Sequence, residues 1–522
     1  MADIVLATIN AKWIHPSLAL RLLKANLGEL ADRAEILEFA LRQRLEEKAA
    51  PILAASPRIL GLSVYIWNHA ASLELLQELE RRWVPGTKPC IVLGGPEASH
   101  LPDSAALLSH ADWVVRGEGE IAFRELCESL LAPGGPGQLA EAAESSDQLA
   151  KATDPLGKSA LPAQDGNPKF IEKPPVELGE LHFAYQLYTQ EDLTKKLVYV
   201  ESSRGCPFSC AFCLSALRSP APGHQAVRDF PLEPFFQEME QLLQRGASSF
   251  KFLDRSFNSN PARSQRILAF FLEQLEKRIP PTHAKGAAQT VPFYLHLELV
   301  PRSFTPASQR LLAQFPPNTL RLEVGIQTLN PAVAAIIKRS GVGAEALESL
   351  RFLRKETSAL LHVDLIAGLP GEGWDSFAQG FNTLWMALHA DVEELPERLE
   401  IQLGILKLLP GTPLAGLSED YGMRYAPEPP YEVLETAALP REDLNRIKNF
   451  ARFWELLVNR GRYPGIAAAL TQGGLGIFEP FMALADWLLL HFRRNWGLDS
   501  KALEAALADY GILNAGNSGG SR

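Results

Sequence analysis

The sequence is poor in cysteine and in positive charge, and it has no long hydrophobic run. Five of 522 residues are cysteine, and an odd number in so long a chain does not suit a disulfide framework. The formal net charge is −10, so no general basic field attracts nucleic acid, which is not an expected partner. No apolar stretch approaches the roughly 20 residues that span a bilayer, so no membrane partner is expected either. Without a signal-peptide pattern, the chain is predicted to be cytoplasmic.

Three of the five cysteines are gathered in one short loop. They are Cys206, Cys210 and Cys213, in the run Glu201-Ser-Ser-Arg-Gly-Cys-Pro-Phe-Ser-Cys-Ala-Phe-Cys213. Three thiolates can hold three irons of a 4Fe–4S cluster and leave the fourth iron without a protein ligand. A zinc site usually needs four protein ligands, commonly as two separated pairs, and the chain offers no second pair. The spacing therefore predicts an iron–sulfur cluster with one open iron.

The remaining two cysteines have a different setting. Cys90 lies in an apolar strand-like run, and Cys127 lies on the face of an expected helix. A small, buried hydrophobic role is predicted for both.

The first part of the chain, residues 1–131, alternates strand-like and helical runs. Strands are expected at 3–8, 34–39, 59–66, 89–93 and 112–115, and helices at 17–30, 71–83 and 120–131. This α/β alternation predicts a Rossmann-like (flavodoxin-like) domain, whose parallel sheet is covered on both faces and binds ligands at the carboxyl ends of its strands. Residues 132–175 are rich in Gly, Pro, Ala, Ser and Gln, which predicts a flexible linker with a poorly ordered middle.

A second alternating series fills residues 176–426. Its strands are expected at 197–202, 249–253, 293–299, 320–326, 361–366 and 399–406. Six βα units fit a partial (β/α)6 barrel better than a closed eight-fold one. Residues 427–522 are predicted to be an all-α domain with a short disordered tail. The helical pattern of its apolar residues predicts a buried packing face, made of Phe450, Phe453, Trp454, Leu457, Phe481, Leu484, Trp487 and Leu488.

The cysteine loop, with Phe212 just before its last cysteine, resembles the cluster loop of radical S-adenosylmethionine (SAM) enzymes. The resemblance implies a partial TIM-type barrel with this loop after its first strand. It implies that the open iron chelates the amino and carboxylate groups of SAM, whose reductive cleavage yields a 5′-deoxyadenosyl radical. It also implies a one-electron donor such as flavodoxin or ferredoxin.

Polar groups follow the second and fourth strands of the second series. Asp254 and Arg255 come after a buried run, and a carboxylate there would pair with the SAM ammonium, although the family more often has a Gly-Gly-Glu type motif at this place. Glu323 and Gln327 alternate along one face of the fourth strand, suited to hydrogen-bonding the ribose or the amino acid part of SAM. Gly325 between them would allow a close approach.

The fifth and sixth strands resemble the family segments beside the adenine of SAM. Asp364 and Gly368 lie in the fifth strand and its glycine-containing end, and the backbone near Leu409 could read the adenine edge. For Asp364 the alternative is a capping or salt-bridge carboxylate. Each signal is weak alone, because Gly-Pro turns after strands are common.

Four loops at strand ends of residues 1–131 form another set, at 10–17, 63–68, 94–99 and 116–120. Glycines after a buried strand let a bulky ligand lie against the backbone. The loops resemble those of the cobalamin-binding domain in cobalamin-dependent radical SAM proteins, in which Gly-Gly-Pro and Gly-Glu-Gly-Glu loops hold the nucleotide tail and the corrin edge. The cobalamin contacts that the resemblance implies are Asn10, His15, Ser63, Tyr65, Gly94, Gly95, Glu97, Gly117, Glu118 and Gly119.

One departure concerns the lower face of the cobalt. The Asp-x-His-x-x-Gly motif, which supplies a histidine to cobalt in methionine synthase-like domains, is absent. His15 lies in the corresponding loop, but its spacing differs and Pro16 follows; capping the helix that starts near Ser17 is the alternative role. The corrin would then be bound without a protein nitrogen below the metal, or this domain would have lost cobalamin.

The resemblance covers nearly the whole chain, including a C-terminal helical domain of unknown function. It implies an enzyme that methylates an unactivated carbon of an unknown small-molecule or peptide substrate. A tRNA methylthiotransferase is one alternative, but it would need three further cluster cysteines. A non-catalytic cluster or cobalamin sensor is another.

Overall fold

The computed structural model describes residues 2–133, 168–217, 227–278, 292–302, 304–389, 398–463, 465–471 and 476–512. The predicted disordered tail at 513–522 and the middle of the predicted linker lie outside these residues. The chain divides into two compact units. The first unit contains Met1–Arg204 and Val227–Leu253, and the second contains Gly205–Ala226 and Asp254–Arg522.

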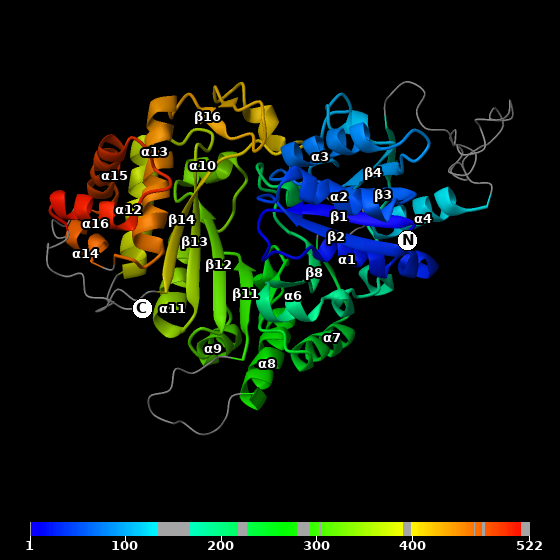
Figure 1. The fold of residues 1–522 in the computed structure, drawn as a ribbon. Coiled ribbons are helices and arrows are strands. Elements are labelled where there is room, and N and C mark those ends of the chain that lie inside the picture. Colours follow the sequence, from blue (N-terminus) through cyan, green and yellow to red (C-terminus); the bar gives the residue numbers. More distant parts are fainter. Residues whose placement is uncertain are drawn as a thin grey trace. The chain divides into compact units, whose positions relative to one another are not determined.

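A parallel sheet forms the centre of the first unit (Figure 1). Its strands run in the order β2-β1-β3-β4-β5-β6, and each neighbouring pair is parallel. This is the flavodoxin-like order, in which the strand order reverses between β1 and β3 and opens a crevice at their carboxyl ends. The bounds are β1 Ile4–Asn10, β2 Ala34–Ala40, β3 Ile59–Ser63, β4 Cys90–Gly94, β5 Trp113–Arg116 and β6 Lys169–Glu172.

Both faces of this sheet are buried, as the alternation along β1 shows. Val5 and Ala7 belong to one core cluster, together with residues of α2 (Leu45–Ala55) and α3 (His69–Arg82). Ile4 and Leu6 belong to a second cluster, with residues of α1 (Leu18–Ala25) and α4 (Glu120–Leu131). Side chains of neighbouring strand residues point to opposite faces, so helices cover both sides and the predicted fold class is confirmed. Cys127 is fully buried in the second cluster and Cys90 packs against it, as predicted.

Three details of this unit differ from the expectation. The strand β6 lies inside the range predicted as linker and pairs with β5, so that part of the linker prediction is wrong. The four residues of β6 were not recognised as a strand, because so short a run gives little signal within a segment rich in Gly, Pro and Ala. The helix expected over 17–30 ends at Ala25, since Gly28 with φ +59° begins a separate 3-10 turn. The helix α2 was not predicted; it contains Pro51, which disfavours a helix interior.

All six strands expected in the second series are present. In the first unit, β7 (Val198–Val200) and β10 (Ser249–Phe252) pair in parallel, with α7 (Leu232–Gln244) between them in the chain. In the second unit, β11 to β14 pair in parallel in chain order. Their bounds are β11 Tyr294–Leu299, β12 Leu320–Gln327, β13 Leu360–Ala367 and β14 Leu399–Ile405.

Helices of the second unit follow or separate these strands (Figure 1). They are α8 Pro261–Arg278, α9 Pro306–Gln314, α10 Pro331–Ile336, α11 Ala344–Glu356 and α12 Trp374–His389. Along β12 every second residue from Leu320 to Ile326 is buried, while Arg321, Glu323 and Gln327 alternate with them and are only partly buried. The strand therefore presents one apolar and one polar face.

The C-terminal helices share an aromatic core with α12. The Phe381 and Trp454 rings lie 4.9 Å apart, and the Phe450 and Phe481 rings 4.8 Å apart. The predicted packing face is confirmed, with Trp487 only partly buried. The all-α prediction is wrong for its first residues, since β15 (Arg424–Tyr425) pairs antiparallel with β16 (Val433–Glu435). The helices are α13 Arg441–Trp454, α14 Ile466–Thr471, α15 Phe478–Phe492 and α16 Ser500–Asp509.

Membrane-spanning segments were also sought. Within the ranges that the structure describes, no helix combines the length and the hydropathy needed to cross a bilayer.

Candidate functional site

The three cysteines lie in a tight loop after β8 (Ser203–Gly205). Cys213 N donates to the Cys210 carbonyl over 3.1 Å, which closes a turn around the two residues. Cys210 is buried, and Cys206 and Cys213 are partly buried. Burial raises the pKa of the Cys206 thiol, a hydrogen bond with the Phe208 backbone lowers it, and the nearby Cys213 and Cys210 raise it further. The thiols of Cys210 and Cys213 are therefore close enough to Cys206 to influence its pKa.

The loop is held from two sides by backbone hydrogen bonds. Ala211 N donates to the Ile337 carbonyl and the Ala211 carbonyl accepts from Leu414 N, both over 2.9 Å. Arg339, just after α10, adds a side-chain contact, because its Nη1 donates to Cys210 Sγ over 3.8 Å. The cysteines are thus presented by a fixed backbone with a cation beside one sulfur.

The donor set of the loop, three thiols, is one that an iron–sulfur cluster can use. Among the described residues, no group of three His, Cys, Asp or Glu side chains is arranged to hold one metal ion. A 4Fe–4S cluster binds each cysteine to a different iron, so its sulfurs stand farther apart than the ligands of one ion. Three thiols on one loop that is anchored by backbone hydrogen bonds therefore fit a cluster.

The end of β12 contains a strained residue with an unsatisfied polar atom. Gln327 has φ +71°, which is rare for a residue other than glycine. Its Oε1 is buried and has no hydrogen-bond partner within the described residues. A Cβ on Gly325 would lie 2.4 Å from Gln327 Nε2, so the glycine makes room for this amide. A buried, unpaired acceptor calls for a donor such as a hydroxyl or an amine, which suits the role predicted for Gln327.

Polar side chains on β11 and β12 form close pairs. His296 Nε2 lies 2.7 Å from Glu323 Oε2, and Arg255 Nη1 lies 3.5 Å from Glu298 Oε2. Glu323 lies on β12, and Arg255 contacts Glu298 on β11, the strand that pairs with β12. Whether either binds SAM remains a prediction.

Farther along, His362 is held between two carboxylates. Its Nε2 lies 3.4 Å from Asp364 Oδ1, and its Nδ1 lies 3.2 Å from Glu400 Oε2. Burial, the largest single cause, opposes its charge, but the hydrogen bonds to Asp364 and Glu400 together with nearby negative charges raise the pKa of His362 to about 10. The salt-bridge alternative for Asp364 is therefore realised, while a cofactor contact through its second oxygen remains a prediction.

The other predicted SAM residues have distinct environments. Asp254 is 2% exposed. A Cβ on Gly368 would lie 2.5 Å from Val433 Cγ1, so this glycine serves internal packing. The Leu409 carbonyl accepts from the Thr412 hydroxyl over 2.8 Å, which engages part of the backbone expected to read adenine.

Glu372 was missed from the sequence. Its side chain is 3% exposed, Oε1 accepts from Thr328 Oγ1 over 2.7 Å and from Ser376 Oγ over 3.3 Å, and Oε2 is buried without a partner among the described residues. Burial raises the pKa of Glu372 to about 7, although both hydroxyls oppose the shift. The residue ends the run Gly368-Leu-Pro-Gly-Glu372. The glycines and the proline of this run were interpreted as a turn, and the glutamate was not considered.

The carboxyl edge of the first sheet is built around Glu38. Its Oε1 accepts from Asn10 Nδ2 over 3.1 Å and from Ser17 N, and its Oε2 lies 2.9 Å from Arg21 Nη1. Asn10 is therefore engaged within the protein through its amide nitrogen. Ser17 is the N-cap of α1 and accepts from Leu20 N.

His15 has a partner on β7. Its Nδ1 lies 2.9 Å from Tyr199 Oη in a hydrogen bond. Burial, and then the charges of Lys251 and Lys12, lower its pKa, so the ring is neutral at pH 7. The helix-capping alternative is wrong, because Ser17 supplies the cap. A contact of His15 with cobalt remains a prediction.

Large aromatic side chains are exposed in the loops after β1 and β3, on either side of the crevice. Trp13 is 50% and Trp67 is 47% exposed. The Tyr65 ring stacks on Trp67 with centroids 4.3 Å apart. Burial raises the pKa of Tyr65, and hydrogen bonds with Ser63 and Ser17 oppose this. Exposed aromatic surface at a switch point suits a large planar ligand.

The predicted glycines have different roles. Gly95, at φ +96°, would place a Cβ 2.6 Å from the Val64 carbonyl, so it permits close packing of two loops. Gly117, at φ +82°, has no heavy atom within 4 Å of its Cβ position. Open space above a backbone is what a bound cofactor requires, and Gly117 fits the prediction better than Gly95. Gly94 is the last residue of β4, and Gly119 is the N-cap of α4.

The two predicted glutamates are used inside the protein. Glu97 Oε1 lies 2.8 Å from His69 Nδ1. Glu118 pairs with Arg228, lies 3.6 Å from Arg204 Nη1 and accepts from Val176 N over 3.1 Å. These bonds fix the loop after β5. We therefore expect Glu118 to affect cofactor binding indirectly, by holding this loop in place.

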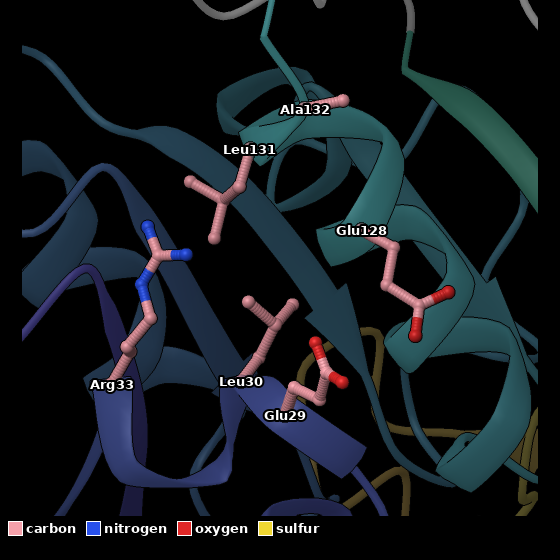
Figure 2. Close-up of a pocket in the computed structure, with 6 residues that line it drawn as sticks. All are labelled: Glu29, Leu30, Arg33, Glu128, Leu131 and Ala132. Atoms are coloured by element: carbon pink, nitrogen blue, oxygen red, sulfur yellow. The ribbon is translucent and has the colours of Figure 1, made fainter.

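The pocket in Figure 2 lies away from these strand ends. Leu30 and Leu131 stand between Arg33 on one side and Glu29 and Glu128 on the other, and Ala132 completes the lining. Arg33 directly precedes β2, which places the pocket at the amino ends of the strands. Ligands of such sheets bind at the opposite edge, and we assign the pocket no function.

Three family models match the chain. The B12 binding domain matches residues 4–127 and the Radical SAM superfamily matches residues 200–384. A protein family of unknown function, DUF4080, matches residues 419–507. The chain therefore contains a B12-binding domain, a radical SAM domain and a C-terminal domain without an assigned role.

Two curated relatives are similar over much of the chain. The 2-(S-pantetheinyl)-carbapenam-3-carboxylate methyltransferase of Streptantibioticus cattleyicolor is 28% identical, with 74% of this chain and 52% of the relative covered. The cobalamin-dependent radical SAM methyltransferase TokK of Streptomyces tokunonensis is 26% identical, with 83% and 61% covered. The chain thus spans about half to three fifths of the length of these relatives.

A solved structure shares the fold. It is the radical S-adenosylmethionine methyltransferase TsrM from Kitasatospora setae, with cobalamin and a [4Fe-4S] cluster bound. The TM-score is 0.56 at 18% identity, with 93% of this chain and 99% of that chain covered.

Proposed function

We propose that this chain, which belongs among the proteins that combine a B12-binding domain with a radical SAM domain, is a cobalamin-dependent radical SAM methyltransferase. Its reaction is the methylation of an unactivated carbon in a small molecule or a peptide. The observation that carries the proposal is the anchored loop of Cys206, Cys210 and Cys213, in the same chain as a flavodoxin-like sheet with exposed aromatics at its switch point. Both curated relatives are methyltransferases by name.

The three cysteines would hold the cluster, and the end of β12 would hold SAM. When bound, the cluster supplies the electron that cleaves SAM, and cobalamin supplies the methyl group. Gln327 Oε1, buried and without a partner among the described residues, would accept from a ribose hydroxyl or from the SAM amine. Asp254 and Glu323 would supply negative charge for the SAM ammonium, and Arg255 a positive charge for a carboxylate.

In the first unit, the loops around the β1/β3 crevice would hold cobalamin. Gly117 leaves its backbone open to the cofactor, and Trp67 with Tyr65 offers a planar surface. His15 is neutral at pH 7, but its Nδ1 is engaged by Tyr199. These loops would hold the corrin, and the proposal assigns no residue as a ligand of the cobalt.

A one-electron donor of the flavodoxin or ferredoxin type would complete the system, since the chain has no second cluster motif to relay electrons. The methylthiotransferase alternative is not favoured. It requires three cysteines beyond the loop, and the chain has only Cys90 and Cys127, which belong to an apolar core.

The test is anaerobic reconstitution of the full chain with iron, sulfide and hydroxocobalamin, followed by reduction in the presence of SAM. We expect iron, a corrin absorbance and 5′-deoxyadenosine. Each of Cys206→Ala, Cys210→Ala and Cys213→Ala should abolish that product. Cys90→Ala is the matched control, because it removes a thiol of this chain outside the loop, and it should form the product normally.

Two outcomes would contradict the proposal. A wild-type chain that retains iron and corrin but makes no 5′-deoxyadenosine would favour the sensor alternative. A chain that takes up zinc and no iron under strictly oxygen-free conditions would remove the chemical basis altogether.

A further inference from the structure

The guanidinium of Arg339 joins a cysteine of the loop to the end of a strand. Nη1 donates to Cys210 Sγ over 3.8 Å, and Nη2 donates to the Gly325 carbonyl. Nε is buried and has no partner among the described residues. Because the guanidinium is planar and rigid, two bonds in different directions fix its orientation against the sulfur.

The helix α10, which directly precedes the segment with Arg339, is held at both ends. At the start of α10, Asn330 Oδ1 accepts from Ala332 N over 2.9 Å, and Asn330 Nδ2 donates to Ser376 Oγ over 2.8 Å. At its end, the Ile337 carbonyl accepts from Ala211 N, inside the cysteine loop. Arg339 therefore reaches Cys210 from a support that is bonded to the same loop.

We propose that Arg339 is a positioning residue that raises the reduction potential of the cluster through Cys210. The inference rests on the proposed function, because it requires a cluster at the three cysteines. One-electron reduction adds one negative charge to the cluster and its thiolates, and no bond to Arg339 forms or breaks. A hydrogen bond to a ligating sulfur and an adjacent positive charge both stabilise the reduced form.

A purely structural role makes a different prediction. If Arg339 only anchored the loop to Gly325, its removal would lower the fraction of chains that hold a cluster. The clusters that did form would keep the wild-type potential. The potential of the loaded fraction therefore separates the two roles.

The experiment compares three variants with the wild-type full chain. Arg339→Met removes the charge and the donors, and Arg339→Lys keeps the charge but loses the planar pair of donors. Arg302→Met is the matched control, because the Arg302 guanidinium lies 5.5 Å from the centroid of the Phe208 ring on the same loop. Each protein is reconstituted without oxygen and assayed for iron and sulfide. The midpoint potential of its cluster is then measured, without SAM, by a redox titration that is followed by electron paramagnetic resonance.

We expect the midpoint potential to become most negative in Arg339→Met and to shift less in Arg339→Lys. Arg302→Met should shift it least. A loaded Arg339→Met protein with the wild-type potential would overturn the inference and leave the proposed function standing. An equal shift in Arg302→Met would also overturn it, since any nearby cation would then suffice.

Two further outcomes are decided by the same data. If Arg339→Met does not load, the potential of Arg339→Lys decides, where a negative shift supports the inference and an unchanged value overturns it. A wild-type chain that binds no iron overturns both the inference and the proposed function.

Discussion

The strand ends of the two units offer different chemistry to a ligand. In the first unit the polar side chains are largely bonded within the protein, as Glu38 and Glu118 are, and the exposed groups are rings and backbone. In the second unit the corresponding places hold thiols, the ion pair of Arg255 with Glu298, and Gln327, whose buried Oε1 has no partner among the described residues. A surface of rings and open backbone suits a large, flat cofactor, whereas converging charges suit a small zwitterion.

The largest expected effect comes from the cysteines. The triple replacement of Cys206, Cys210 and Cys213 by alanine should remove essentially all cluster iron, since the thiolates are its ligands. Corrin absorbance of the same preparation should persist, because no cysteine contributes to the first-unit loops. Iron, sulfide and visible spectra measure both. If corrin were lost together with iron, the two cofactor sites would not be independent, which would contradict the comparison.

The glycines of the first unit divide into packing and binding roles. Gly95→Ala should lower the free energy of unfolding by about 2–3 kcal/mol, since its Cβ would meet the Val64 carbonyl at 2.6 Å with φ positive. Gly117→Ala should cost only about 1 kcal/mol, for its backbone conformation, but should lose cobalamin. Thermal unfolding and cobalamin titration distinguish them. Equal cobalamin affinity in wild type and Gly117→Ala would remove Gly117 from the site.

Glu372 provides a pH test confined to the second unit. Its folded-state pKa of about 7 exceeds the ordinary value of 4.5, so the folded state binds the proton more tightly. Stability from this group is therefore present below about pH 4.5 and is lost as the pH rises to about 7, by up to about 3 kcal/mol. Glu372→Gln should flatten this part of the stability profile.

Thermal unfolding at several pH values measures the Glu372 effect. The exposed Glu419→Gln of the same unit is the control and should keep the wild-type slope. A slope that is identical in Glu372→Gln and wild type would mean that the buried carboxyl does not titrate in this range.

The smallest effect is expected at the aromatic surface. Trp67→Ala should weaken cobalamin binding roughly tenfold, because a stacked aromatic contact contributes about 0.5–1.5 kcal/mol beyond the buried area. Trp496→Ala removes an equally large exposed ring from the C-terminal domain and should leave the affinity unchanged. Equal affinities in both variants would show that the rings of the first unit are not part of the cofactor site.

The periodicity of apolar residues predicted most helices and strands. It failed for very short elements and for elements that contain or adjoin glycine and proline. All six strands of the second series were predicted, since apolar residues recur along each of these segments. The strand β6 was missed inside a Gly- and Pro-rich segment, and the helix α2 was missed because it contains Pro51. The strand β16 was missed because three residues carry no detectable period.

The site was predictable only where its residues are close in the sequence. The spacing of the cysteines identified the cluster loop, and the glycine loops were identified because they directly follow buried strands. Arg339 and Glu372 carry no such local signal, since one meets Cys210 from 129 positions away and the other meets Thr328 from 44. His15 was placed in the right loop, but its partner Tyr199 lies 184 residues later.

The sequence alone determined which atoms are available, namely three thiols at a fixed spacing, two strand–helix series and loops rich in glycine at strand ends. Only the tertiary structure decided which polar groups are already satisfied. Glu118 and Asn10 are bonded to partners distant in the chain, while the buried Gln327 Oε1 has no hydrogen-bond partner among the described residues. The physical reason is that hydrogen bonds and charge pairs depend on distances that folding sets, whereas residue type and local period are fixed before the chain folds.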